Sequence, residues 1–348
     1  MPAVSPASLL TTAEGVLAVC ATDPEEQMLL LSDDDTAPEL IEAFLAALDE
    51  RGVHDPALIT MRVRHPAFAD LPRVVEGALL AANLVLDLTT VPWLYSDSLT
   101  RYSLESAAAG SRLAMIWGMP DSLSTIAACP PSPTLTAQAL RGLAALEQAR
   151  TLHVWDVDGT DFRVELGEPQ AYPRGFIGQP PTQPGMIGVP LCASVTAPFV
   201  PGTATGTLVF QSAGRFQGPV NAPFRSEEPI VIRAKAGKVI GIEGEHAAAV
   251  TLADWFASGP QDDVTTIMDC NIGFDPRAEL SWADNTVIHA YAGGIMIGIA
   301  NPYTYRHNGS HRPGYHLDLM FPGLTVDLDD QPFLRAGGFV AARFAGEE

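Results

Sequence analysis

The sequence predicts a mixed α/β and α+β fold in two domains, with a boundary near residue 150. In residues 1–150, strands alternate with amphipathic helices, which is typical of a doubly wound, mostly parallel sheet with helices on its faces. In residues 151–348, short strands separated by turns predominate, which predicts a β-rich domain. The length of 348 residues also exceeds what one small core needs.

The N-terminal domain is predicted from helical periodicity and from the residues that end helices. Leu40, Phe44 and Leu48 fall on one helical face, and Gly52 follows where that helix would end. No GxGxxG motif follows the first strand, so the dinucleotide-binding motif of such sheets is missing. The expected strands are 27–31, 57–64, 84–88 and 113–117, and the expected helices are 37–51, 74–82, 99–109 and 135–150.

The C-terminal domain is predicted from short apolar runs between turn residues. Residues 169–188 are rich in proline, glycine and glutamine and are expected to form a loop. Residues 246–257 have the pattern of a helix. The expected strands are 152–157, 162–166, 206–211, 230–234, 239–242 and the apolar run 290–299.

Composition excludes several classes of function. A formal net charge of -21 repels phosphate backbones, which argues against a nucleic-acid partner. No apolar run reaches the roughly 18 residues that span a bilayer, and no signal-peptide pattern is present, so no membrane role is expected. The four cysteines show no CxxC spacing and do not form a disulfide framework, which favours a reducing, cytoplasmic setting.

The stretch from Tyr315 to Leu319 carries the first chemical motif. On a strand, His316 and Asp318 point to one face while Leu317 and Leu319 point to the other. An imidazole and a carboxylate so placed can occupy neighbouring positions around a divalent metal ion. The alternative is a hydrogen-bonded histidine on a half-buried strand, which is the more frequent situation for such a pair on its own.

Several further segments, taken in order, resemble the C-terminal domain of two related families. These families are the thermophilic metallo-aminopeptidases of the aminopeptidase T type and the 2,5-dihydroxypyridine 5,6-dioxygenases. The dioxygenase resemblance is closer in length, in the stretch Gly273 to Glu279 and in His316-Leu317-Asp318. The segments are Thr196-Ala197-Pro198, 206–210, 266–279, 293–298, 301–305 and 314–318.

The resemblance implies a ligand set for one metal ion. His316 and Asp318 match the His-x-Asp pair of both families, and Asp269 stands where the aminopeptidases have a glutamate and the dioxygenases a histidine. One imidazole and two carboxylates suit Fe(II) or Mn(II), with Zn(II) also possible. Ala193 and Met296 replace two further ligands of the two-metal aminopeptidases, which favours a single metal.

The resemblance also implies residues around the substrate. Tyr303 matches a functional tyrosine of the aminopeptidases, and Tyr305 competes with it for the role of hydrogen-bond donor. Tyr95 and Arg163 stand where the dioxygenases have pocket histidines, and an arginine can clamp a carboxylate. We therefore expect a substrate related to dihydroxypyridine but different from it, for example one with a carboxylate. His289 is expected either as an acid or base in the pocket or as a core histidine.

The function predicted from these residues is a mononuclear non-haem iron dioxygenase that opens a hydroxylated aromatic or N-heteroaromatic ring. The alternative is a metal-dependent hydrolase of the aminopeptidase T type that acts on an amide or peptide. A third possibility is a non-enzymatic role with a degraded metal clamp. The resemblance further implies a homo-oligomer that acts on a small molecule.

Overall fold

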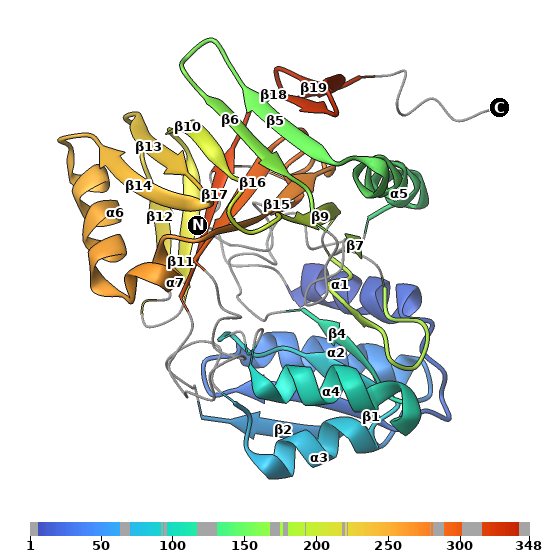
Figure 1. Ribbon diagram of the computed structural model, residues 1–348. Coiled ribbons are helices and arrows are strands. Elements are labelled where there is room, and N and C mark those ends of the chain that lie inside the picture. The colour runs from blue at the N-terminus through green and yellow to red at the C-terminus, as the bar shows by residue number, and fades with distance from the viewer. Residues whose placement is uncertain are drawn as a thin grey trace. The chain divides into compact units, whose positions relative to one another are not determined.

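The computed structural model describes most of the chain, and its residues group into two compact units (Figure 1). Unit 1 comprises Met1–Ser132 and Ile177–Cys192, and unit 2 comprises Pro133–Phe176 and Ala193–Glu348. The described residues are 6–62, 70–91, 93, 96–116, 131–167, 175–176, 180–191, 193–217, 220, 222–278, 280, 289–300 and 315–340.

Unit 1 contains a five-stranded parallel sheet in the order β2-β1-β3-β4-β8. Every residue of β1, β3 and β4 is buried, as expected for parallel strands covered on both faces. The strands are β1 (Met28–Asp33), β2 (Ala57–Met61), β3 (Leu84–Asp87), β4 (Arg112–Met115) and β8 (Ile187–Gly188). The helices are α1 (Pro6–Val19), α2 (Pro38–Glu50), α3 (Arg73–Ala81) and α4 (Asp97–Ala109).

The four helices described in unit 1 pack in two pairs. α1 packs against α2, and their buried side chains join those of β1 and β3 in one apolar cluster. α3 packs against α4. The side chain of Ser96 caps the start of α4, and Gly110 ends it in a left-handed conformation with φ of 78°. The alternating strands and helices predicted for this part of the chain are therefore found.

The units do not divide at residue 150. α5 (Pro133–Gln148) belongs to unit 2, because Leu135, Ala139 and Leu146 pack into the core of that unit. Residues 177–192 return to unit 1, where β8 pairs with β4. The segment 169–188 is thus not loop throughout, since it contains β8 and β7 (Gly175–Phe176).

Unit 2 is built from two antiparallel sheets. The eight-stranded sheet has the order β14-β13-β10-β6-β5-β18-β19-β20, and the seven-stranded sheet has the order β12-β11-β17-β16-β15-β9-β7. The first contains β5 (Thr151–Trp155), β6 (Asp161–Glu165), β10 (Thr205–Phe210), β13 (Ile230–Lys235), β14 (Lys238–Glu243), β18 (Thr325–Leu328), β19 (Gln331–Arg335) and β20 (Gly338–Phe339). The second contains β9 (Ser194–Pro198), β11 (Ala213–Gln217), β12 (Ala222–Arg225), β15 (Ile267–Gly273), β16 (Ile295–Ile299) and β17 (His316–Phe321), together with β7. The helices of unit 2 besides α5 are α6 (Ala247–Ser258) and α7 (Gln261–Val264).

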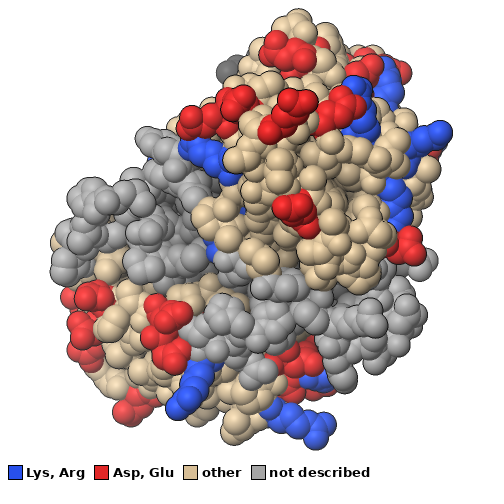
Figure 2. All heavy atoms as spheres, turned by 90° about the vertical axis from the view of Figure 1, so that its left-hand side faces the viewer, with Lys and Arg blue, Asp and Glu red and all other residues tan. Residues whose placement is uncertain are grey.

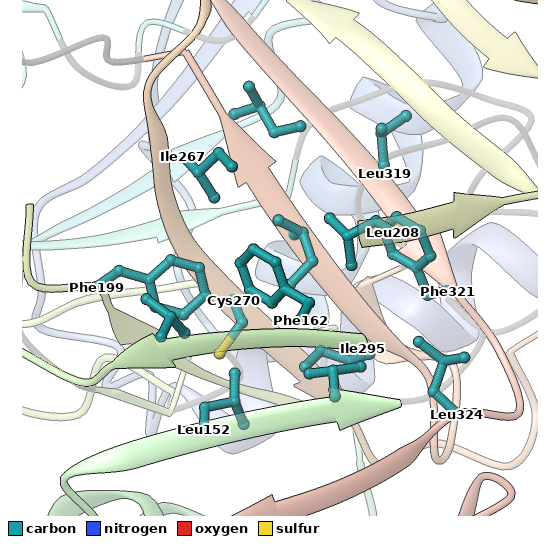
Figure 3. Packing of buried hydrophobic residues seen from close by; sticks show 14 of the residues in the cluster. Leu152, Phe162, Phe199, Leu208, Ile267, Cys270, Ile295, Leu319, Phe321 and Leu324 are labelled. Carbon is teal, nitrogen blue, oxygen red and sulfur yellow. The ribbon is translucent and has the colours of Figure 1, made fainter. Parts of the chain in front are cut away.

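The core of unit 2 lies between the two sheets (Figure 3). Leu152 and Phe162 come from the eight-stranded sheet, whereas Cys270, Ile295 and Leu319 come from the seven-stranded sheet, and all belong to one buried cluster. Because side chains alternate along a strand, the residues between these apolar ones project from the opposite face of the seven-stranded sheet. We call this opposite face the site face.

Acidic and basic side chains are interspersed on the face of the molecule that Figure 2 shows. On the side shown in Figure 2, acidic side chains are scattered over both parts of the molecule, and Lys and Arg are interspersed among them. This agrees with the net charge of -21 and offers no basic patch on that side for a phosphate backbone. Among the described residues, no helix is both long and apolar enough to cross a membrane.

Candidate metal centre

The pair His316 and Asp318 lies on β17 as its sequence pattern predicts. Leu317 and Leu319 point into the core between the sheets, and His316 and Asp318 lie on the site face. Both are buried, with 3% and 1% of their surface exposed. Nε2 of His316 lies 3.0 Å from Oδ1 of Asp318. The strand therefore presents one imidazole nitrogen and one carboxylate oxygen side by side.

An irregularity in β15 places Asp269 on the same face. Ile267 pairs with Ile299 and faces the core, but Asp269, two residues further on, pairs with Gly298, so one extra residue is accommodated between them. Such a β-bulge reverses the alternation of side chains. Without it, Asp269 would face the same way as Ile267. The bulge is therefore what brings Asp269 to the site face.

Three neighbouring strands align the two carboxylates across a glycine. Asp269 of β15 pairs with Gly298 of β16, which in turn pairs with Asp318 of β17. A Cβ atom on Gly298 would lie 1.9 Å from Oδ1 of Asp269 and 3.2 Å from Cε1 of His316. The carboxylate of Asp269 thus occupies the space that a side chain at Gly298 would fill, and it points toward His316.

The backbone fixes the imidazole of His316. Nδ1 of His316 lies 3.2 Å from the carbonyl oxygen of Ala300, to which it donates a hydrogen bond. Ala300 has a φ of 70°, which is unusual for a residue with a side chain and lies just beyond the end of β16. Because Nδ1 is engaged by this carbonyl, Nε2 is the nitrogen that faces Asp318 and remains for a metal ion.

Two side chains from other segments approach the second oxygen of Asp318. Nε2 of Gln217 on β11 donates a hydrogen bond to Oδ2 at 2.5 Å. Nε2 of His289 lies 3.4 Å from the same oxygen. His289 lies two residues before Tyr291, which forms a β-bridge with Asp275, just beyond the end of β15. Oδ1 and Oδ2 of Asp318 therefore have different partners.

Electrostatics couple His316 to Asp318. Burial raises the pKa of Asp318, but the positive charge of the adjacent His316 outweighs this effect and holds the pKa well below its usual range. Burial lowers the pKa of His316, but the Asp318 carboxylate beside it outweighs this and raises the pKa to about 9. In the absence of a metal ion, the charged forms of His316 and Asp318 stabilise each other as a buried ion pair.

Asp269 has no comparable partner. Burial, at 3% exposure, raises the pKa of Asp269 to about 6, with His316 opposing and Asp318 adding to the shift. Its Oδ1 is buried and makes no hydrogen bond within the described part of the chain. A buried carboxylate oxygen without a donor is costly, so its presence indicates that it binds something other than these residues.

These residues fit a metal ion in part. Two ligand atoms about 2.1 Å from a metal and at a right angle to each other lie about 3.0 Å apart, which matches the separation of His316 Nε2 and Asp318 Oδ1. The unpartnered Oδ1 of Asp269 lies on the same face, next to the ring of His316, and is a candidate third ligand atom. Among the described residues, however, no three His, Cys, Asp or Glu side chains already close around one point. The described residues supply a ligand pair and one free carboxylate oxygen.

The other residues predicted from the sequence are distributed differently. Tyr95, Tyr303 and Tyr305 lie outside the described residues. Arg163 is not brought to the cluster, because alternation in β6 turns Phe162 and Val164 into the core and Arg163 outward, where its side chain is 57% exposed and lies 3.5 Å from Asp330. The structure therefore does not bring Arg163 to this cluster, and its role at the substrate stays a prediction.

The two residues that replace aminopeptidase ligands have different positions. Met296 lies on the site face, where it pairs with Asn271 and Met320 and forms a small apolar cluster with Met320. Ala193 is packed into the core of unit 2. Neither offers a donor for a second metal ion at this cluster.

Three residues of the site were not predicted from the sequence. Strand pairing brings Gln217 and Gly298 to the cluster, and this pairing cannot be read from a sequence. Asn271 lies two residues from Asp269 on the site face, is 2% exposed, and its Oδ1 has no hydrogen-bond partner in the described structure. Asn271 could have been noticed in the sequence, because it is a polar residue between the apolar residues Cys270 and Ile272 of a predominantly buried strand.

The fold of this chain is similar to that of two solved structures. A solved 2,5-dihydroxypyridine dioxygenase from Pseudomonas putida superimposes with a TM-score of 0.77 and 22% identity, covering 97% of this chain and 98% of that one. AmpT, an aminopeptidase T from Thermus thermophilus, superimposes with a TM-score of 0.60 and 14% identity, covering 96% of this chain and 99% of that one. These likenesses confirm the predicted fold class.

The sequence comparison is more specific. The model of the 2,5-dihydroxypyridine 5,6-dioxygenase family matches residues 8–341, so the chain belongs to this family. A curated 2,5-dihydroxypyridine 5,6-dioxygenase from Pseudomonas putida is 25% identical over 363 aligned positions, covering 97% of each chain. The chain is therefore an oxidoreductase of the dioxygenase class, and the family resemblance inferred from its motifs is confirmed.

Proposed function

We propose that this protein is a mononuclear non-haem Fe(II) dioxygenase that cleaves the ring of a hydroxylated aromatic or N-heteroaromatic compound of the dihydroxypyridine type. Family membership supports ring cleavage by a dioxygenase. The observation that carries the metal assignment is the 3.0 Å separation of His316 Nε2 and Asp318 Oδ1, next to the unpartnered Oδ1 of Asp269.

One imidazole and two carboxylates favour Fe(II) or Mn(II) over a metal that prefers thiolates, and Zn(II) remains an alternative that elemental analysis distinguishes. Cys270, the cysteine adjacent to Asp269, is packed in the apolar core and offers no thiolate on the site face. Fe(II) supplies, when bound, the one-electron chemistry that lets O2 react with an electron-rich ring. Because a ligating imidazole must be neutral at the nitrogen that binds the metal, metal binding should release a proton from His316.

The protein side chains then have separate tasks. His316, Asp318 and Asp269 hold the metal. His289 lies next to the ligand pair without being fully buried, and it accepts or donates the proton of a ring hydroxyl at Nε2. The unpartnered Oδ1 of Asn271 accepts a hydrogen bond from a donor group of the ring, such as a hydroxyl or a protonated ring nitrogen. Binding both reactants beside fixed groups lowers the barrier by holding them in a reactive orientation.

The substrate class follows from what surrounds these groups. Asn271 and Met296 lie beside the ligands on the site face. Arg215, which is buried, lies on the same face, where β11 pairs it with Asp318. Arg163, which suggested a substrate with a carboxylate, points away from this face. A buried arginine beside the ligands favours a hydroxylated heterocycle that carries negative charge, either as an ionised ring hydroxyl or as a carboxylate. A homo-oligomeric state and a cytoplasmic location stay predictions.

The test is oxygen uptake by protein that is loaded anaerobically with Fe(II). With 2,5-dihydroxypyridine, we expect O2 consumption together with loss of the ring absorbance, and no turnover under anaerobic conditions. Asp318→Ala should abolish both metal binding and turnover. Asp161→Ala is the matched control, because Asp161 forms a similar pair with His153 at 2.8 Å on the other sheet.

Two results would reject the proposal. Turnover of an amide or peptide in the absence of O2 would favour the hydrolase alternative, in which metal-activated water is the nucleophile. An Asp318→Ala variant that kept both metal and activity would show that the reaction takes place elsewhere. Iron content as isolated distinguishes these cases further, because the hydrolase alternative predicts zinc and a non-enzymatic role predicts no stoichiometric metal.

A further inference from the structure

Gln217 holds the second oxygen of a proposed metal ligand. It lies on β11, where it pairs directly with His316 of β17, and its side chain reaches Asp318, two residues along that strand. Only 4% of Gln217 is exposed. Since a carboxylate accepts hydrogen bonds and cannot donate them, the amide nitrogen must be the end of Gln217 that faces Asp318.

The two oxygens of Asp318 are thereby made different. Oδ1 faces Nε2 of His316 at 3.0 Å, whereas Oδ2 accepts the hydrogen bond from Gln217 at 2.5 Å. A carboxylate without such a partner can rotate and bind a metal through either oxygen or through both. A donor on Oδ2 favours binding through Oδ1 alone, and single-oxygen binding leaves one more coordination position for reactants.

We propose that Gln217 is a positioning residue that directs Oδ1 of Asp318 to the metal and keeps Oδ2 out of its coordination sphere. The proposal rests on the metal site of the proposed function. Outer residues that hydrogen-bond to ligating carboxylates commonly tune metal affinity in this way.

His289 does not duplicate this role. Its Nε2 lies 3.4 Å from Oδ2, which is longer than the contact from Gln217. The side chain of His289 is 15% exposed, so it has more freedom than the buried amide. With Gln217 as the constant donor to Oδ2, His289 can turn to the substrate without releasing the ligand. This division separates the residue that positions the ligand from the one that moves a proton.

The test is the affinity of Gln217→Met for Co(II) and Fe(II), measured anaerobically by competition with a chromophoric chelator. Methionine has a similar shape and lacks the N–H donor. We expect metal affinity to fall by about 10- to 100-fold. We also expect the visible spectrum of bound Co(II) to change, because carboxylate binding through two oxygens alters the coordination number. The metal-free variant should stay folded, with a lower thermal midpoint than the wild type, because Oδ2 of the buried Asp318 loses a donor.

Gln211→Met is the matched control. Gln211 lies next to the end of β10, is exposed, and donates its amide to the carbonyl oxygen of Glu227 at 2.7 Å, away from the cluster. It should change neither affinity nor spectrum. Gln217→Leu is the second variant, and it should reproduce the effect of Gln217→Met.

Equal metal affinity and an unchanged Co(II) spectrum in Gln217→Met would overturn the assignment. Loss of folding in both Gln217 variants without metal would overturn it too, because Gln217 would then serve the sheet itself. The proposed function fails separately, through absence of O2-dependent ring cleavage in wild-type protein whose metal affinity is measured in the same experiment.

Discussion

The carboxylate of Asp269 occupies the place of the side chain that Gly298 lacks. The two residues pair across β15 and β16, and a Cβ atom on Gly298 would lie 1.9 Å from Oδ1 of Asp269. Real Cβ atoms essentially never approach a heavy atom within 3.0 Å. The third proposed ligand can therefore take this position only because residue 298 is a glycine and has no Cβ atom.

Gly298→Ala should displace the Asp269 carboxylate while leaving the sheet intact. The added Cβ meets the end of a side chain and not backbone, and Gly298 has no positive φ that alanine would find strained. We expect at least about tenfold weaker metal binding, as for other losses at or near a ligand. The measurement is chelator competition together with circular dichroism. Gly77→Ala is the control, because nothing lies within 4 Å of a Cβ there, and it should keep full affinity.

Asp269→Ala should weaken metal binding and yet stabilise the metal-free protein. The variant removes a buried carboxylate whose Oδ1 has no hydrogen-bond partner among the described residues, a state that costs roughly 1 to 3 kcal/mol. Thermal unfolding of metal-free samples provides the measurement. Asp275→Ala is the comparison, because Asp275 is equally buried but paired with Arg277 at 2.6 Å, and its loss should destabilise. A destabilised Asp269→Ala variant would mean that Asp269 serves the fold.

His289→Gln should reduce turnover without loss of metal. As a general acid or base, His289 would contribute a factor of about 100 to 10,000 to kcat. Because it is not one of the proposed ligands, the affinity for Fe(II) should stay within about threefold of the wild-type value. His153→Gln is the control, since His153 pairs with Asp161 and its side chain has the same exposure of 15%. Loss of metal in His289→Gln would make His289 a ligand.

The stability of the fold should depend on pH through Asp87 in unit 1. Burial raises its pKa to about 6 from the ordinary aspartate value of 3.8, while hydrogen bonds from Thr89 and Trp93 oppose the shift and Asp33 adds to it. The folded protein thus holds this proton more tightly than the unfolded chain. The resulting stabilisation is complete below about pH 4 and is lost as the pH rises through about 6.

Asp87→Asn removes this dependence and can be compared with the wild type at two pH values. Between pH 5 and pH 7.5, the wild type should lose about 1.4 kcal/mol more stability than the variant. Urea unfolding at each pH gives the difference, and any constant effect of the substitution cancels. If both proteins changed in parallel, the Asp87 carboxyl would not bind its proton more tightly in the folded state.

Local patterns allowed much of this structure to be predicted. The faces of His316 and Leu317 follow from the two-residue repeat of a strand, and the helices of unit 1 follow from apolar spacing. The assignment of α5 to unit 2 could not be predicted from its sequence. An amphipathic pattern shows that one face of a helix is buried, but it does not show which part of the protein covers that face. The two-residue strand β8 is likewise too short to produce a repeat.

The site was less predictable because its parts meet through long-range pairing. The bulge that turns Asp269 to the site face depends on its register with β16, and the contact from Gln217 to Asp318 spans 101 residues of chain. Family resemblance identified Asp269 because it compares positions and does not need the register. It also suggested Arg163, which the alternation of β6 directs away from the cluster.

The origin of the oxygen atoms in the product tests the central claim most directly. Wild-type protein loaded with Fe(II) is supplied with 2,5-dihydroxypyridine under 18O2, and the ring-opened product is analysed by mass spectrometry. A dioxygenase predicts that both atoms of one O2 molecule enter the product. A product that carries label only from 18O-labelled water, formed equally well without O2, would contradict the account.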